Sequence, residues 1–393
     1  MAAELPSMLL INDDDEAVRV EMDKMVIHCA SHRSSTASAF LMPDFSNKLI
    51  KLEDKYEYND SLDSMIGMGA FGAVFKGNVK DSTDPVAIKR MLKVHVKESE
   101  LKLIKELHSE YLVGVLDICN YDDFFCCLIM ELCDCDLDHH MRNISEKGRL
   151  NQSNFRQVYR LFKILCIRDW DKLGIVGGGS KHVLILREER IKKLFKKVLV
   201  SVSRKIFLKT RNHSSLELFR LLMDNIARGY KALYELKIVH RDIKPQNILI
   251  TYTDASKQIA CARITDFGIA RTLDDESEEL CNVAGTFYYM APEVGANLLK
   301  TCQYDSKVDM WSIGCLLYQC VTGEVPFDEC SLCKLFLYTA GANFDAYDPP
   351  ELPVELSQEV SGIIQSLLQL DTTQRCTPTQ FYDKAIGWSQ QIC

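Results

Sequence analysis

The 393-residue sequence contains no run of about 18 apolar residues, the length that a membrane-spanning helix needs. We therefore expect no transmembrane segment. Residues 1–6 lack the basic stretch of a secretory signal peptide, and the apolar run at 8–11 is too short for its hydrophobic part. These two absences argue against a membrane or secreted protein. We expect an intracellular, cytoplasmic protein, and we leave access to the nucleus open.

Cysteine is plentiful, but its distribution does not indicate a disulfide framework. The sixteen cysteines are scattered through a long chain, so we expect most of them to be reduced and packed as small apolar side chains. Cys330 and Cys333 form a single CxxC with no second pair, which is weak evidence for zinc. The hydrophobic content of 47% is sufficient for a sizeable core.

The most informative feature is the stretch 240–247, which reads HRDIKPQN, followed later by a DFG triplet that begins at Asp266. Phosphoryl transfer to a hydroxyl requires a carboxylate that orients the hydroxyl and accepts its proton. It also requires a cation at the transferring phosphoryl group, and an amide oxygen with a second carboxylate that hold Mg²⁺. Asp242, Lys244, Asn247 and Asp266 fit these roles in that order. We therefore predict that Asp242, Lys244 and Asn247 are catalytic and that Asn247 and Asp266 ligate the metal.

A glycine-rich stretch upstream, 66–74, reads IGMGAFGAV and contains GxGxxG. Glycines let the backbone pass close to phosphates, because a Cβ there would clash. A dinucleotide-binding fold is the rival interpretation, but it requires a helix directly after the glycines. Strand-like residues follow here instead, at 73–75 and 86–89. The sequence therefore predicts a β-hairpin over the phosphates of ATP.

Lys89 ends the second of these strand-like stretches and is the predicted ligand of the α- and β-phosphates, a role that needs a carboxylate partner on a helix. Apolar residues recur at helical spacing in the segment 98–107, which predicts that helix. Glu100 is the best candidate for the partner of Lys89. Glu98 and Glu106 remain alternatives.

Over residues of about 58–388 these motifs together resemble the eukaryotic protein kinases. The segment 285–293 resembles the end of the family's activation segment, and 309–314 resembles its buried central helix. The resemblance implies a bilobal α+β fold, with a small β-rich N-lobe that contains one key helix and a larger, mostly helical C-lobe. It also implies ATP and Mg²⁺, and it places Arg375 where it can pair with Glu293. No catalytic position of the family is substituted, so the motifs give no support to a pseudokinase.

The resemblance also implies where the nucleotide binds. A strand at 124–130 is expected to lead into a hinge at 131–133, and Met130 to gate the pocket behind the adenine. The predicted nucleotide-binding residues are Ile66, Gly67, Met68, Gly69, Ala70, Phe71, Gly72, Ala73, Val74, Ala87, Lys89, Glu100, Glu131 and Cys133.

Two residues resemble the serine/threonine branch of the family. Lys244 follows Asp242 by two residues, whereas tyrosine kinases usually carry an arginine-containing catalytic loop. Thr286 lies near the end of the activation segment, where we expect it to contact Asp242 and Lys244. We therefore expect phosphorylation of serine and threonine hydroxyls in protein substrates. A weaker resemblance to the autophagy-initiating ULK-type kinases rests on the segments 318–327, 335–338 and 366–371.

The predicted domain organisation is a disordered, acidic and serine-containing tail at 1–55 and a protein kinase domain at 56–388. Within this domain we expect the N-lobe at about 56–131 and the C-lobe at about 134–388. The segment of about 161–213 departs from the family pattern, because a kinase needs only a short connection there. It forms the predicted insert.

This insert is strongly basic: it holds fourteen Lys or Arg and four Asp or Glu, a net charge of +10 in a chain of net charge −8. Three explanations stay open: a patch for an anionic partner such as lipid or nucleic acid, a solvated flexible loop, and an artefact of gene prediction. We expect no dedicated nucleic-acid-binding domain. Ser214 and Glu217 fit a capping box, so a helix from Ser214 to about Leu236 can form entirely after the insert. If the insert disrupts the C-lobe instead, the alternative function is a nucleotide-binding scaffold.

The activation segment, 266–293, also makes a prediction about regulation. Arg241 usually marks kinases in which a basic cluster binds a phosphorylated residue of this segment. Asn282 occupies the position where that phosphate acceptor often lies, and acidic residues at 274–276 and 278–279 can supply negative charge. We therefore expect activity without phosphorylation at the usual position.

Overall fold

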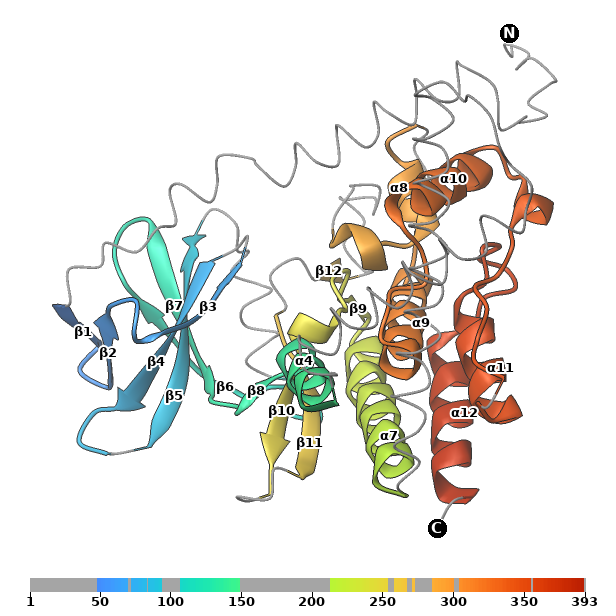
Figure 1. Cartoon of the computed structure of the whole chain (residues 1–393). Helices are drawn as coiled ribbons and strands as arrows, with labels where there is room; N and C mark the ends of the chain where they lie inside the picture. Colours follow the sequence, from blue (N-terminus) through green and yellow to red (C-terminus); the bar gives the residue numbers. More distant parts are fainter. Residues whose placement is uncertain are drawn as a thin grey trace, which may run out of the picture.

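The structure, a computed structural model, consists of two lobes joined by the hinge that follows β7 (Figure 1). It describes residues 48–69, 72–82, 84–93, 107–148, 213–253, 258–266, 271–272, 285–299, 304–354 and 356–391. A β-sheet forms the N-terminal lobe, and helices dominate the C-terminal lobe. The predicted bilobal α+β fold is confirmed. The predicted helix at 98–106, most of the tail and most of the insert lie outside the described residues.

The N-terminal lobe is a seven-stranded sheet in which every pair of neighbouring strands is antiparallel. Its strands lie in the order β1-β2-β4-β5-β7-β6, and β3 pairs with β4 beside this path. The strands are β1 (Lys48–Leu52), β2 (Tyr56–Asp60), β3 (Met65–Gly69), β4 (Gly72–Val79), β5 (Pro85–Leu92), β6 (Val115–Asn120) and β7 (Phe125–Glu131).

The sheet begins at Lys48, earlier than the predicted start of the N-lobe at Tyr56, and this part of the prediction is wrong. β1 pairs with β2 along its whole length, from Lys48 opposite Asp60 to Leu52 opposite Tyr56. Leu52 is buried in the core of the lobe. The strand is short and carries two exposed lysines, so its apolar pattern is too weak to recognise in the sequence.

The two faces of this sheet carry different side chains, because neighbouring residues of a strand point to opposite faces. One face forms a closed core that includes Leu52, Tyr58, Phe75, Ile88 and Ile129. The other face carries Ala87, Met91, Leu128 and Met130, and it packs against Leu249 of the C-terminal lobe. Side chains of β5 thus build both the core of the lobe and the apolar lining of the space between the lobes.

Arg90 is a buried cation that ties β5 to the N-terminal hairpin. Its guanidinium lies 3.6 Å from a carboxylate oxygen of Asp60 on β2 and 5.2 Å from the ring centre of Phe75 on β4. Aromatic faces attract cations, and an ion pair compensates part of the cost of burying a charge. These contacts explain why the β1–β2 hairpin is part of the lobe.

The C-terminal lobe is built on three long helices, α7 (His213–Glu235), α9 (Lys307–Thr322) and α12 (Pro378–Gln391). The other helices are α4 (Leu137–Gly148), α8 (Pro292–Ala296), α10 (Glu329–Ala340) and α11 (Gln358–Leu367). Short 3-10 helices are η3 (Pro245–Asn247), η4 (Phe287–Tyr289) and η5 (Phe344–Ala346). Strands β8 (Cys135–Asp136), β10 (Ile248–Tyr252) and β11 (Ile259–Ile264) form a small sheet, and β9 (Ile238–Val239) pairs with β12 (Arg271–Thr272).

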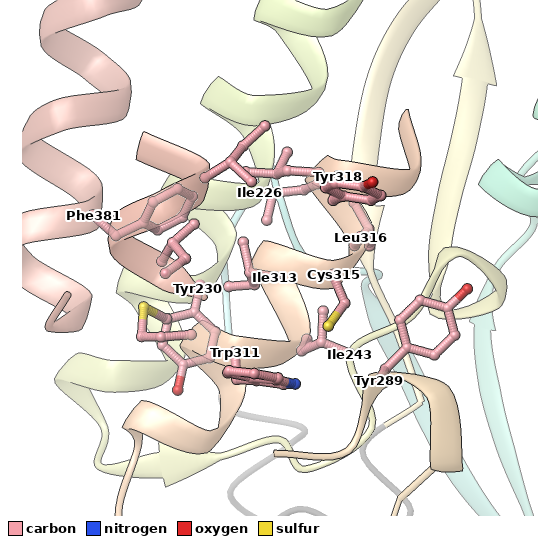
Figure 2. Packing of buried hydrophobic residues seen from close by; sticks show 14 of the residues in the cluster. Ile226, Tyr230, Ile243, Tyr289, Trp311, Ile313, Cys315, Leu316, Tyr318 and Phe381 are labelled. Atoms are coloured by element: carbon pink, nitrogen blue, oxygen red, sulfur yellow. The ribbon is translucent and has the colours of Figure 1, made fainter. Parts of the chain in front are cut away.

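Helix α9 is the centre of the lobe and is buried along nearly its whole length, which requires a helix that is mostly apolar all round. Figure 2 shows its side chains interleaved with Ile226 and Tyr230 of α7 and with Phe381 of α12. Trp311 stacks on Phe327 with 5.4 Å between the ring centres. Ile243, from the predicted catalytic loop, is part of the same core.

Helices on both sides of the insert belong to this core. Leu137 at the start of α4 and Leu222 of α7 are both buried in it. Helix α7 runs from His213 to Glu235, close to the predicted span, and α4 continues to Gly148. Within the described residues, no helix has the length and apolar character needed to cross a membrane.

We predict that the ion pair between Arg375 and Glu293 makes a large contribution to the stability of the C-terminal lobe. Both groups are buried, with bonds of 2.5 and 3.0 Å, as the sequence predicted. Glu293→Gln leaves the guanidinium charge unpaired and should lower the free energy of unfolding by about 3–5 kcal/mol. Urea denaturation measures this loss, with the exposed Glu351→Gln as control. Equal stability of the two variants would contradict the prediction.

Candidate active site

The loop that carries Asp242 lies between β9 and η3, and the buried carboxylate of Asp309 fixes its backbone. The backbone N–H groups of His240 and Arg241 donate to the two oxygens of Asp309 at 2.6 and 2.7 Å. The hydroxyl of Tyr230 donates to the same carboxylate at 2.9 Å. Burial raises the pKa of Asp309, while His240, these N–H groups and the Tyr230 hydroxyl oppose that rise. Asp309 therefore holds the loop from the first turn of α9.

The backbone of this loop is strained at Arg241, where φ is +67°. A non-glycine residue rarely adopts this left-handed conformation unless the surrounding contacts enforce it. His240 closes the turn, because its Nδ1 accepts from the backbone N–H of Asp242 at 3.2 Å and its Nε2 donates to the carbonyl of Thr265 at 2.9 Å. The loop therefore presents Asp242 from a rigid support.

The carboxylate of Asp242 is buried in a small network of donors. Lys244 Nζ donates to Oδ2 at 2.6 Å, and the Asn247 side-chain amide donates to the same oxygen at 3.1 Å. The backbone N–H and the hydroxyl of Thr286 donate to Oδ1 at 3.0 and 2.8 Å. Lys244 also donates to the Thr286 hydroxyl at 2.7 Å, so the expected contacts of Thr286 are confirmed.

Two oxygen-bearing side chains among the predicted site residues are suited to a hard cation. Asn247 uses its amide nitrogen to bond Asp242, which leaves the amide oxygen as the atom of the group that can ligate a metal. Asp266 follows β11 and adopts a φ of +66°. A carboxylate and an amide oxygen are ligands that Mg²⁺ accepts, so these residues fit the predicted metal.

Lys89 bridges the two lobes by an ion pair with Asp266, with 2.5 Å between Nζ and Oδ1. Lys89 lies on β5 and is buried, and Asp266 lies in the C-terminal lobe. The structure therefore brings together the predicted phosphate ligand and the predicted metal ligand. Glu100, the predicted partner of Lys89, lies outside the described residues.

The glycine-rich stretch is a hairpin of β3 and β4, as the sequence predicted. Gly67 lies opposite Val74, Met68 opposite Ala73 and Gly69 opposite Gly72. Gly72 cannot be replaced without strain, because its φ is +154° and a Cβ there would lie 2.0 Å from the carbonyl oxygen of Arg90. Ala70 and Phe71 at the tip lie outside the described residues.

An apolar cluster joins the inner face of the sheet to Leu249 of the C-terminal lobe. Val74, Leu132, Cys133 and Leu249 pack around the inner-face cluster that contains Ala87 and Met130. Ala87 and Met130 are direct partners across β5 and β7, so their side chains lie next to each other in this cluster. Sequence reasoning missed Leu249, although its position on a strand two residues after Asn247 was the available signal.

The hinge residues Glu131 and Cys133 differ in exposure and charge. The backbone N–H of Glu131 donates to the carbonyl of Gly114 at 3.0 Å, while its side chain is half exposed and lies 3.9 Å from Arg263. Burial raises the pKa of the Cys133 thiol, although hydrogen bonds with Thr251 and Arg263 oppose that rise. Cys133 therefore packs against the apolar cluster as a neutral thiol.

Comparisons with known proteins agree with this geometry. The family described as "Protein kinase domain" matches residues 61–164 and 180–385, which is more than half of the chain and leaves 165–179 of the predicted insert unmatched. The serine/threonine-protein kinase unc-51 of Caenorhabditis elegans is 30% identical over 345 residues, and human serine/threonine-protein kinase ULK1 is 28% identical over 344 residues. Serine/threonine-protein kinase ATG1a of Arabidopsis thaliana is 34% identical over 163 residues, or 41% of this chain and 24% of that protein.

The first two matches each cover 84% of this chain but only 31% and 25% of the respective relatives. The chain therefore spans about a third or less of the length of these proteins. The predicted resemblance to serine/threonine kinases, including the ULK type, is confirmed. With its two lobes, its catalytic loop and its glycine-rich hairpin, the chain belongs to the protein kinase family.

Proposed function

We propose that this chain transfers the γ-phosphoryl group of Mg-ATP to serine and threonine hydroxyls of protein substrates. The observation that carries the proposal is the network around Asp242, in which Lys244, Asn247 and Thr286 donate to one carboxylate. Asp242 orients the acceptor hydroxyl and accepts its proton as the new bond to phosphorus forms. The bond between the γ-phosphorus and the bridging oxygen of the β-phosphate breaks, and ADP leaves.

Lys244 has two partners that suit it to a role beside the transferring group. Its ammonium lies between Asp242 and Thr286, so a positive charge stands next to the carboxylate that receives the proton. This charge stabilises the negative charge of the phosphoryl oxygens. The bond between Lys244 and Thr286 also supports the serine/threonine assignment.

Lys89, Asn247 and Asp266 bind the nucleotide in this proposal. Lys89 holds the α- and β-phosphates, and the glycine-rich hairpin covers them with backbone rather than side chains. Asp266 and Asn247 hold Mg²⁺, which supplies the charge that neutralises the phosphates. The adenine packs against the apolar cluster that contains Val74, Ala87, Met130 and Leu249, next to the hinge backbone at Glu131 and Cys133.

A nucleotide-binding scaffold is the alternative function, and it requires an insert that disrupts the C-terminal lobe. The packing of α4 and α7 into one core with α9 and α12 favours the enzyme. An anionic partner of the insert and a cytoplasmic location remain predictions from the sequence.

The first prediction concerns Asp242. Asp242→Asn removes the proton acceptor but keeps the shape of the side chain, so transfer of labelled γ-phosphate to a generic basic protein should fall by about 100-fold or more. The exposed Asp345→Asn serves as the matched control and should keep wild-type activity. Phosphoamino-acid analysis should find phosphoserine and phosphothreonine. If wild type binds Mg-ATP but transfers nothing, the scaffold function replaces the enzyme.

The second prediction concerns metal binding and needs no turnover. Saturating ATP at about 100 times its Kd should stabilise the folded protein by about 2.7 kcal/mol, seen as a higher melting temperature. Part of this shift should require Mg²⁺, and Asp266→Asn should lose that part. Asp345→Asn should retain it. An equal Mg²⁺-dependent shift in the Asp266 variant would exclude Asp266 as a ligand.

The third prediction concerns regulation. We expect a phosphatase-treated sample, shown by mass spectrometry to be free of phosphate, to keep at least half of its initial rate of transfer. The physical reason is that Asn282 replaces the usual acceptor while acidic residues of the same segment supply negative charge. Loss of nearly all activity, restored by rephosphorylation of the activation segment, would contradict this expectation.

A further inference from the structure

Arg241 is held at two points by the segment that leads into and begins α9. Its backbone N–H donates to Asp309 in the first turn of this helix. Its guanidinium Nη1 donates to the hydroxyl of Tyr304 at 3.2 Å, and Tyr304 lies three residues before the helix starts. Side chain and backbone of Arg241 are thus attached to one rigid part of the core.

Tyr304 is itself well fixed. The residue is 9% exposed and belongs to the core of the C-terminal lobe. The chain after it is tied into the helix start, because the Asp305 carboxylate accepts from the backbone N–H of Lys307 at 2.8 Å and Ser306 accepts from the Tyr230 hydroxyl at 3.2 Å. A buried aromatic ring with a hydroxyl at its end is a stiff support for a charged donor.

Movement of Arg241 would be transmitted directly to the reacting carboxylate. Arg241 precedes Asp242 and adopts the strained φ of +67°. Its carbonyl oxygen also touches the end of the activation segment, where a Cβ at Gly285 would lie 2.5 Å away. The next residue, Thr286, bonds Asp242 through both its backbone and its hydroxyl. Arg241 therefore links the catalytic loop, the activation segment and α9.

We propose that Tyr304 is a positioning residue for phosphoryl transfer: its hydroxyl anchors the Arg241 guanidinium and thereby holds Asp242 in its reactive orientation. A phosphate on the activation segment is the partner expected for this arginine in the family, and Tyr304 supplies an acceptor that is built into the fold. The proposal rests on the function proposed above for Asp242, and it adds a residue outside the site motifs.

Tyr304→Phe tests this inference, because it removes the hydroxyl and keeps the buried ring. We expect kcat to fall about tenfold while the KM for Mg-ATP changes less than twofold and the melting temperature changes little. Tyr347→Phe is the matched control, since its hydroxyl bonds the carbonyl of Leu368 at 2.6 Å and no member of the Asp242 network. This control should keep wild-type kcat.

A double-mutant cycle with Arg241→Met separates positioning through Arg241 from a general loss of stability. In the Arg241→Met background, Tyr304→Phe should produce no further loss of kcat, because the group on which it acts is absent. Wild-type kcat in the single Tyr304 variant, or an equal tenfold loss in both backgrounds, would overturn the proposal.

Amide hydrogen exchange of residues 238–243 provides a measurement that does not depend on turnover. Tyr304→Phe should accelerate exchange of this segment at least fivefold, and Tyr347→Phe should leave it unchanged. Wild-type protein that transfers no phosphate would refute the proposed function, and the exchange data would still decide whether Tyr304 holds the loop. Unchanged exchange in the Tyr304 variant would refute the inference.

Discussion

The catalytic loop depends on its hydrogen bonds to the buried carboxylate of Asp309. Three donors from two other segments form hydrogen bonds to it. The bonds from the backbone of the loop stabilise the strained conformation at Arg241. Asp309 can be buried because α9 is packed on all sides, and α9 is packed because its residues are mostly apolar. The hydrophobic core of the C-terminal lobe thus determines the position of Asp242, and the next residue, Ile243, is buried in that core.

The two faces of strand β5 contribute to different parts of the structure. Residues alternate along this strand, so Ile88 and Arg90 support the core of the N-terminal lobe while Ala87 and Lys89 face the space between the lobes. The inner face thus presents a buried cation, Lys89, whose charge needs compensation by an anion. Asp266, which comes from the other lobe, supplies that compensation.

The residues of the candidate site were easier to recognise in the sequence than the residues that surround and position them, for a physical reason. Asp242, Lys244, Asn247 and Asp266 were recognisable because phosphoryl transfer restricts residue type at each of these positions. Tyr304 acts through a hydroxyl, which several residue types could provide, so no pattern distinguishes it before the fold is known. Leu249 contributes only apolar surface, and its place two residues after Asn247 was its one signal in the sequence. β1 was missed for a similar reason, since pairing with β2, rather than its own composition, makes it a strand. The long buried helix α9 was recognised because its own residues 309–314 resemble the kinase pattern.

The ion pair between Lys89 and Asp266 has a consequence for what can enter between the lobes. Each partner neutralises the other between the lobes, so a ligand that enters between them meets one charge of each sign. A polyphosphate without a cation would attract the Lys89 ammonium and repel the Asp266 carboxylate. A cation alone would attract the carboxylate and repel the ammonium. An anion that arrives with its own cation satisfies both groups at once. The pair therefore favours ligands of mixed charge, and each lobe contributes one of the two charged groups.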